Sequence, residues 1–325
     1  MIDPPTGPGS STADDSADAA VAHWEAAGRR IDACGHRVWV ADLAERVNVG
    51  NPPLLVLHGF PTCSFDWSAV IEDLRSERRV VLLDFLGFGL SDKPDQRYSM
   101  RGQADVVEAV VAHLGLEQVD LLTHDMGDSI GGEILARSLD GHLGFEVARR
   151  VLTNGSIYIE MAQLTAGQQL LLSLPDARLV GLGDDGGAAF RGGVAATFAP
   201  DSPVDDLEMH VLSAMALRSG GIELLPRTIR YIEDRREEEA RYTGAIEAHP
   251  SPLGVVWGTL DPVAVVAMAE RLQAARPDST LVTLDDVGHY PMIEAPDRFA
   301  ATVIDLLHGH HQSGQRVAGL PRPVR

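Results

Sequence analysis

Short apolar runs alternate with longer segments of helical periodicity along most of the 325-residue chain. Runs of four or five apolar residues are typical of strands buried on both faces, whereas apolar positions three and four residues apart are typical of helices. The runs predict strands at residues 37–41, 53–57, 79–83, 119–122, 150–153, 253–257 and 280–284. The helical pattern occupies residues 65–74, 100–114, 263–275 and a segment that starts at residue 127. Such alternation specifies the α/β class, with a mostly parallel central sheet and helices on both faces.

A long segment between the fifth and sixth of these runs interrupts the alternation. It contains Gly-rich loops at residues 181–193 and helical patterns at residues 164–174, 207–219 and 227–241. The charge run in the last of these helices is interpreted as a solvated face. We therefore expect an α/β core at residues 21–156 and 247–308, a helical cap at residues 157–246, a disordered N-terminal tail at residues 1–20 and a flexible C-terminal tail at residues 309–325.

The amino-acid composition excludes several classes of binding partner. The chain has 47 acidic and 27 basic residues and a formal charge of -20, which argues against nucleic acid or an anionic membrane as partner. No stretch reaches the ~18 apolar residues that span a bilayer, and the N-terminus lacks the pattern of a signal peptide. Cys34 and Cys63 have neither a metal-site spacing nor the density of a disulfide scaffold. These features predict a soluble, cytoplasmic protein, with a small molecule as partner and an oligomeric state that the sequence leaves open.

The stretch LLTHDMGDS at residues 121–129 holds the most informative pattern. Asp125 follows a buried strand, precedes a helix, and has the small residues Thr123 and Gly127 two positions away on either side. This is the pattern of a nucleophile elbow, a tight strand-to-helix turn that lifts the central side chain clear of the sheet. Asp128 either complements the helix dipole, which we favour, or raises the pKa of Asp125.

An elbow nucleophile needs an acid and a histidine later in the chain. Asp261 and His289 each come just after a predicted strand, where ligand sites of open α/β sheets gather. We assign the triad to Asp125, Asp261 and His289. The backbone amides of Phe60, in the loop HGFP, and of Met126, directly after the nucleophile, are assigned to an oxyanion hole.

The histidines at the C-terminus offer a second kind of site. His308, His310 and His311 could ligate a metal ion, but the stretch has no periodicity and we favour a frayed terminus. No metal and no organic cofactor is required by the triad.

These residues resemble the α/β-hydrolase superfamily, and within it the aspartate-nucleophile branch of epoxide hydrolases and haloalkane dehalogenases. The resemblance covers residues 24–307 and is closest to the mesoderm-specific transcript protein group, in the motifs HGFPT (58–62), LDFLGFGLSDKP (83–94) and HDMGD (124–128). The Asp-x-x-Gly-x-Gly-x-Ser part of the second motif is interpreted as a tight loop beside the active site.

An aspartate nucleophile implies alkyl rather than acyl chemistry, because a carboxylate can attack an sp³ carbon and form an ester with it. Water activated by His289 then hydrolyses the ester. The resemblance implies a Trp after the nucleophile and, in dehalogenases, an Asn at the position of Phe60; the chain has Met126 and Phe60 instead.

We therefore predict an epoxide hydrolase acting on a small apolar substrate and water, with a haloalkane dehalogenase as the alternative. An epoxide oxygen needs an acid, and the resemblance implies a cap tyrosine, for which the candidates are Tyr158, Tyr231 and Tyr242. A catalytically silent binding or sensor protein is a further alternative. A serine esterase is disfavoured, because Ser129 lies within the predicted helix rather than at its start.

Overall fold

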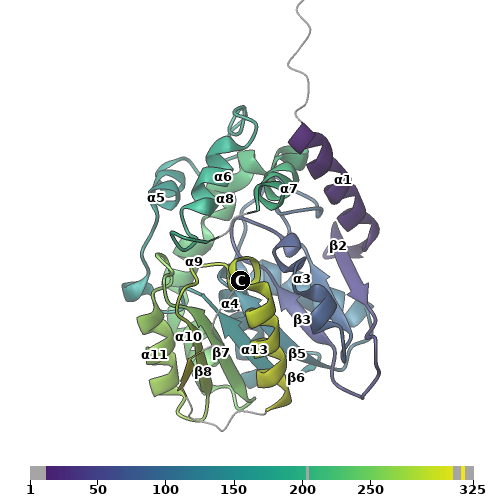
Figure 1. Cartoon of the computed structure of the whole chain (residues 1–325), viewed down its shortest axis with the longest axis vertical. Coiled ribbons are helices and arrows are strands. Elements are labelled where there is room, and N and C mark those ends of the chain that lie inside the picture. Colours follow the sequence, from purple (N-terminus) through teal and green to yellow (C-terminus); the bar gives the residue numbers. More distant parts are fainter. Residues whose placement is uncertain (1–11, 203–204, 310–315, 319–325) are drawn as a thin grey trace, which may run out of the picture.

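The predicted sheet is present and extends over nine strands. The computed structural model describes residues 12–202, 205–309 and 316–318. The strand order is β1-β2-β4-β3-β5-β6-β7-β8-β9. Strand β2 is antiparallel to β1 and β4, and the remaining neighbours are parallel. The strands are β1 (Arg29–Ala33), β2 (His36–Leu43), β3 (Leu54–Leu57), β4 (Val80–Leu83), β5 (Gln118–His124), β6 (Glu146–Thr153), β7 (Leu253–Gly258), β8 (Thr280–Leu284) and β9 (Arg316–Ala318). This is the α/β-hydrolase fold that the sequence predicts (Figure 1).

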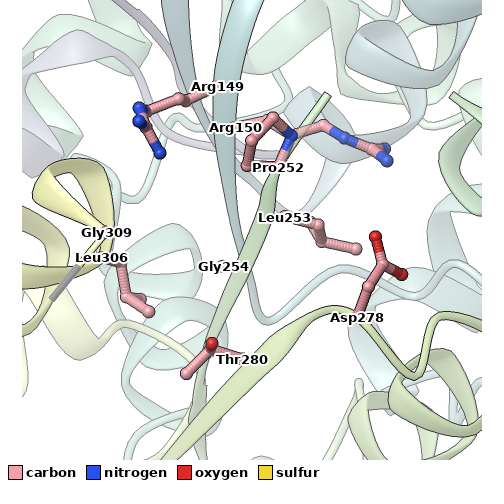
Figure 2. A pocket seen from close by; sticks show the side chains of 9 residues that line it. All are labelled: Arg149, Arg150, Pro252, Leu253, Gly254, Asp278, Thr280, Leu306 and Gly309. Atoms are coloured by element: carbon pink, nitrogen blue, oxygen red, sulfur yellow. The ribbon is translucent and has the colours of Figure 1, made fainter. Parts of the chain in front are cut away.

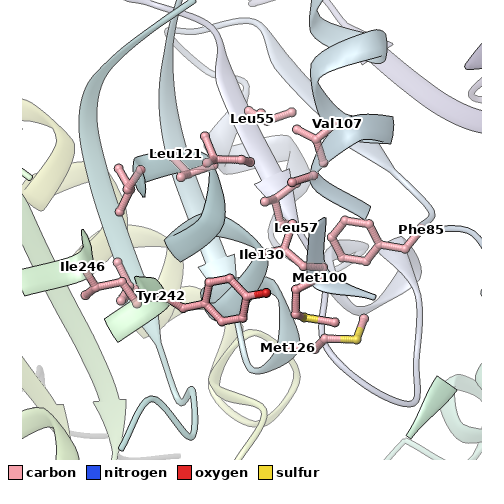
Figure 3. Packing of buried hydrophobic residues seen from close by; sticks show 14 of the residues in the cluster. Leu55, Leu57, Phe85, Met100, Val107, Leu121, Met126, Ile130, Tyr242 and Ile246 are labelled. Carbon is pink, nitrogen blue, oxygen red and sulfur yellow. The ribbon is translucent and has the colours of Figure 1, made fainter. Parts of the chain in front are cut away.

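Helices cover both faces of the sheet, because successive strand residues point to opposite sides. Leu55 and Leu57 of β3 join one apolar cluster with α3 (Met100–His113), α4 (Met126–Leu139), α10 (Glu239–Ala248) and α11 (Val266–Ala275) (Figure 3). Leu54 and Val56 join the other cluster, with α1 (Thr12–Ala26), α2 (Ile71–Leu74), α12 (Pro291–Glu294) and α13 (Pro296–His308). The central strands are therefore buried on both sides, as their continuous apolar runs require.

The segment between β6 and β7 is helical throughout most of its length. Its helices are η2 (Ile159–Met161), α5 (Ala166–Ser173), α6 (Ala188–Ala195), α7 (Asp206–Leu217), η3 (Arg218–Gly220), η4 (Ile222–Leu224), α8 (Leu225–Thr228), α9 (Tyr231–Glu237) and α10. Helices α5 to α8 lie together in the upper part of Figure 1, beyond the sheet. Helix α10 instead packs closely on α4 of the core: a Cβ on Gly132 would lie 2.8 Å from the carbonyl oxygen of Tyr242.

Part of the expected N-terminal tail is a helix. Residues 12–20 belong to α1, which extends to Ala26. Ala17, Val21 and Trp24 lie on one face of it and are buried, and the Trp24 ring lies 5.8 Å from that of Trp39 in β2. The same helix contacts α7. An amphipathic stripe at helical spacing therefore holds the segment against the protein, in place of the predicted disorder.

Two predicted helices are divided in the structure. Residues 65–74 form the 3₁₀ turn η1 (Ser64–Trp67) and then α2, with the Ser64 amide bound to the side chain of Asp84 at 2.8 Å. Residues 227–241 form α8, α9 and the start of α10, with a break at Glu238 (φ -116°, ψ 20°). Helices α9 and α10 pack on different partners, α3 and α4, so a single straight helix would not reach both.

The C-terminal segment also departs from the prediction. Residues 316–318 form β9, which pairs in parallel with β8, where a flexible tail was expected from residue 309. His310 and His311 lie outside the described residues, and His308 forms an ion pair with Glu77 at 3.2 Å. Within the described ranges, every helix is too short or too polar to cross a membrane.

Candidate active site

Asp125 occupies a strained turn between β5 and α4. Its φ of 49° and ψ of -113° lie in a region that non-glycine residues seldom adopt, which the flanking elements enforce. The turn has no space for larger neighbours: a Cβ on Gly127 would lie 2.7 Å from the carbonyl oxygen of Leu57, and one on Gly59 would lie 2.8 Å from the Cβ of Asp125. The structure thus places Asp125 at a nucleophile elbow, buried at the carboxyl end of the sheet.

The predicted base and its acid converge on this carboxylate. The Nδ1 atom of His289 donates to Oδ2 of Asp261 at 2.7 Å, and its Nε2 atom lies 4.0 Å from Oδ1 of Asp125. Oδ1 of Asp261 accepts hydrogen bonds from the amides of Val263 (2.7 Å) and Ala264 (2.9 Å). These bonds fix the carboxylate, which in turn orients the imidazole with Nε2 toward Asp125.

The charges around His289 determine its protonation. Burial opposes the imidazolium, but Asp261, then Asp125 and Glu294, stabilise it and raise the pKa of His289 to about 9. The charge on Asp125 is one of these, so the carboxylate at the elbow acts on the protonation of His289.

The Phe60 amide lies where an oxyanion hole requires a donor. It donates to Oδ2 of Asp125 at 3.0 Å. Met126, the other predicted donor, is the first residue of α4, and its side chain packs in the core beside Met100 (Figure 3). The loop that carries Phe60 is held by His58, whose Nε2 atom accepts from the Phe85 amide at 3.0 Å.

The second motif forms the tight loop that the sequence suggests. Both carboxylate oxygens of Asp84 accept backbone amides, one from Ser64 at 2.8 Å and one from Leu90 at 2.7 Å. Ser91 donates to the Asp84 carbonyl oxygen at 2.6 Å. Asp84 therefore has a structural role: its hydrogen bonds connect η1 to the loop after β4.

Two positioning residues were missed in the sequence. Asn154, just after β6 and with a φ of 51°, donates to Oδ2 of Asp261 at 2.7 Å and accepts from the Gly258 amide at 3.1 Å. Glu294 accepts from the amides of Gly288 (2.9 Å) and Tyr290 (3.0 Å), on either side of His289. In the sequence, Asn154 could have been identified by its position at the end of a predicted strand and before a glycine. No sequence feature points to Glu294.

The three candidate tyrosines lie in different places. Tyr158 donates to Glu247 at 2.7 Å, and Arg271 stacks on its ring at 4.0 Å, so its hydroxyl is engaged away from Asp125. Tyr242 belongs to the core cluster of Figure 3, and the charges that act on it are those of Asp234, Glu133, Arg101 and Glu238. These two tyrosines are not brought to the nucleophile.

Tyr231 lies beside the nucleophile. It is 2% exposed, and its ring centre is 5.4 Å from that of Phe60, whose amide binds Asp125. Burial and then the charge of Asp125 raise the pKa of the Tyr231 hydroxyl above its usual value, so the group is a neutral donor at physiological pH.

Asp128, in the first turn of α4, is also buried. It accepts a hydrogen bond from the Thr123 hydroxyl, and burial followed by the Asp125 charge raises its pKa well above the usual range. This shift disfavours the charged form of Asp128, which is the form that the helix-dipole interpretation requires. The repulsion between the two carboxylates acts on the pKa of Asp128.

An apolar cavity of about 190 Å³ reaches His289 of the predicted triad. Phe60, His289 and Tyr290 line its inner end. Its remaining wall comes mainly from the segment between β6 and β7, with the apolar residues Leu171, Phe190, Val194, Ile222 and Leu225. The lining includes no Trp and no Asn, the residues whose N–H groups bind a halide.

A second cavity, of about 240 Å³, is unrelated to this site. It lies where β7 and β8 begin (Figure 2). This is the end of the strands opposite to the triad. Arg149 and Arg150 extend to opposite faces of β6, and Arg150 donates to the carbonyl oxygens of Ile246 (2.7 Å) and His249 (2.9 Å).

Comparison with known proteins agrees with this fold. Residues 54–302 match the model of the alpha/beta hydrolase family, which is more than half of the chain. The chain therefore belongs to this family, and it is a hydrolase of the α/β type.

Particular relatives extend over nearly the whole chain. LipZ of Mycobacterium tuberculosis, whose name describes a hydrolase, is 40% identical over 292 residues, which cover 88% of this chain and 98% of LipZ. The human mesoderm-specific transcript homolog protein is 34% identical over 289 residues, covering 85% of this chain and 84% of its own, so the predicted homology to that group is confirmed. Neither name states a substrate.

Solved structures share the fold. An alpha/beta hydrolase fold protein from Burkholderia ambifaria superposes with a TM-score of 0.67 at 24% identity, over 86% of this chain and 99% of its own. The enol-lactonase from Burkholderia xenovorans also has a TM-score of 0.67, at 21% identity and the same coverage of 86% and 99%. At these identities the likeness concerns the architecture alone.

Proposed function

We propose that the chain is an epoxide hydrolase that acts through an ester of Asp125. The single observation that carries the proposal is the arrangement of the Asp125 carboxylate. One oxygen, Oδ2, is held by the Phe60 amide at 3.0 Å, while the other, Oδ1, faces His289 and has no hydrogen-bond partner among the described residues. The unbound oxygen is therefore available to attack carbon.

The reaction has two steps. Oδ1 of Asp125 attacks a ring carbon of the epoxide, the carbon–oxygen bond breaks, and the released oxygen takes the hydroxyl proton of Tyr231. Water then loses a proton to His289 and attacks the Asp125 carbonyl carbon, where the Phe60 amide stabilises the oxyanion. The diol leaves, and the proton on His289 restores the Tyr231 hydroxyl.

The site favours an epoxide over a halide. Tyr231 offers an O–H donor beside the nucleophile, whereas the cavity lining lacks the Trp and Asn donors of a halide site. The walls are apolar and the volume is about 190 Å³, which suits a small aliphatic or aromatic substrate. Ser129, the residue an esterase would need, is buried within α4.

Mass spectrometry of the variant His289→Gln tests the proposal. Without its base the protein should form the ester but not hydrolyse it, so incubation with 1,2-epoxyhexane should add the full mass of the epoxide to the peptide that contains Asp125. A haloalkane would instead add the mass of the alkyl group, after loss of the hydrogen halide.

The double variant Asp125→Asn/His289→Gln is the control and should remain unlabelled. Labelling by haloalkanes alone would identify the alternative dehalogenase. A protein that forms no adduct with either panel would be a binding or sensor protein, and the proposal would be wrong.

A further inference from the structure

Arg235 of α9 is a buried cation in the middle of this site. Its side chain is 2% exposed, and its Nε and Nη1 atoms have no hydrogen-bond partner among the described residues. No carboxylate of those residues forms an ion pair with it, although most other arginines of the chain are paired in this way. An unpaired guanidinium in the interior is costly, so its position needs a compensating charge nearby.

The groups that face Arg235 belong to the reaction. Its guanidinium carbon lies 5.2 Å from the centre of the Tyr231 ring, and its positive charge acts to lower the pKa of the Tyr231 hydroxyl. Its charge also acts on Asp128, one turn after the nucleophile. The charge of Asp125 acts on the same Tyr231 hydroxyl, so Arg235 and the nucleophile act on one group with opposite charges.

The charge balance changes during the first step. When Asp125 becomes an ester, its negative charge disappears from the nucleophile and reaches the oxygen that leaves carbon. That oxygen takes a proton from Tyr231, so the charge comes to rest on the phenolate. The positive charge of Arg235, 5.2 Å from the ring centre, stabilises a phenolate at this position.

We propose that Arg235 is a positioning residue that receives the charge displaced from Asp125, by stabilising the Tyr231 phenolate during ring opening. This inference rests on the proposed epoxide chemistry. It assigns Arg235 to the alkylation step alone, because in the hydrolysis step the phenolate only has to regain its proton.

A double-mutant cycle separates this role from a structural one. In the His289→Gln background, the rate at which 1,2-epoxyhexane labels Asp125 is measured by mass for Arg235→Met, Tyr231→Phe and both together. Arg235→Met should slow labelling by about 10- to 100-fold, no more than the loss of the general acid itself, which typically costs about 10²–10⁴-fold. In the Tyr231→Phe background, Arg235→Met should have no further effect, since no phenolate forms.

Two further variants serve as controls. Arg235→Lys keeps the charge and should recover part of the rate. Arg236→Met removes the neighbouring exposed arginine and should label at the unaltered rate. Circular dichroism and the melting temperature of each variant report on folding.

The outcomes are distinct. Multiplicative effects of Arg235→Met and Tyr231→Phe, or an unchanged rate in Arg235→Met, would overturn the role of Arg235 while leaving the epoxide chemistry intact. If the His289→Gln protein takes up no epoxide at all, the proposed function is wrong and the role of Arg235 is overturned with it.

Discussion

Two parts of the fold bring residues to Asp125. His289 lies in a loop that follows a core strand, and Tyr231 lies in a helix of the segment between β6 and β7. The base side is hydrogen-bonded throughout. Asp261 receives bonds from Val263, Ala264, Asn154 and His289, and its two oxygens have no unused position.

The acid side is built from buried groups with few bonds. Arg235 has two unpartnered nitrogens, and Asp128 has an unpartnered oxygen among the described residues. The two sides therefore orient their groups by different means. The base is fixed by backbone amides at strand ends, whereas the acid depends on packing and on the balance of buried charges.

The largest loss of activity is expected when the hydrogen bond between Asp261 and His289 is disrupted. In Asp261→Asn, the side-chain oxygen must still accept from Val263 and Ala264, so the amide nitrogen faces Nδ1 of His289. The imidazole is then forced into the tautomer that cannot accept a proton at Nε2. Diol formation should fall by about 10³–10⁴-fold in steady-state assays.

This variant should accumulate the ester, because alkylation does not need the base. Asp285→Asn, in an exposed position of the neighbouring loop, is the matched control and should keep full activity. Equal slowing of ester formation and ester hydrolysis by Asp261→Asn would contradict the separation of the two sides.

A smaller loss is expected on the acid side. Tyr231→Phe removes the proton donor but keeps the ring packed on Phe60, so the site should stay folded. Ester formation from 1,2-epoxyhexane should slow by about 10²-fold, with hydrolysis of the ester much less affected. Rapid quench followed by mass spectrometry measures the two rates.

Tyr242→Phe is the matched control, since this hydroxyl is buried and unpartnered within the described chain. It should leave both rates nearly unchanged. A larger loss in Tyr242→Phe than in Tyr231→Phe would show that the acid has been assigned to the wrong tyrosine.

The same contrast explains what the sequence could predict. Asp125, Asp261, His289 and Phe60 each follow a short apolar strand, and parallel strands bring their carboxyl ends to one edge. Local pattern and chain order were therefore sufficient to name residues that the structure brings together. The sheet and most of its helices were predictable for the same reason.

The acid side was not predictable, because its residues are brought together by tertiary packing. The charge run around Arg235 was interpreted as a solvated face, and this was wrong for Arg235, which is 2% exposed. The break at Glu238 turns α9 toward α3, and no residue at that position signals it. Helix α1 was missed because polar and small residues outnumber the three that anchor it.

The last prediction concerns pH and tests whether the two sides share one charge balance. In the free protein the pKa of His289 is about 9, raised by Asp261 and Asp125 against the opposing effect of burial. Ester formation removes the Asp125 charge, so the pKa of His289 should be lower in the intermediate. Hydrolysis of the ester should increase about tenfold per pH unit below this lower pKa and level off above it.

Single-turnover hydrolysis of a preformed ester between pH 5 and 10, at constant ionic strength, gives the pKa of the intermediate, and NMR titration of the His289 ring gives that of the free protein. Asp125→Asn imitates the uncharged ester and should lower the His289 pKa in the same direction. Identical pKa values in free protein and intermediate would mean that the Asp125 charge does not reach the base. The charge on Asp125 would then act on Tyr231 but not on His289. Formation of the ester would leave the pKa of His289 unchanged and would not favour the neutral base that hydrolysis requires.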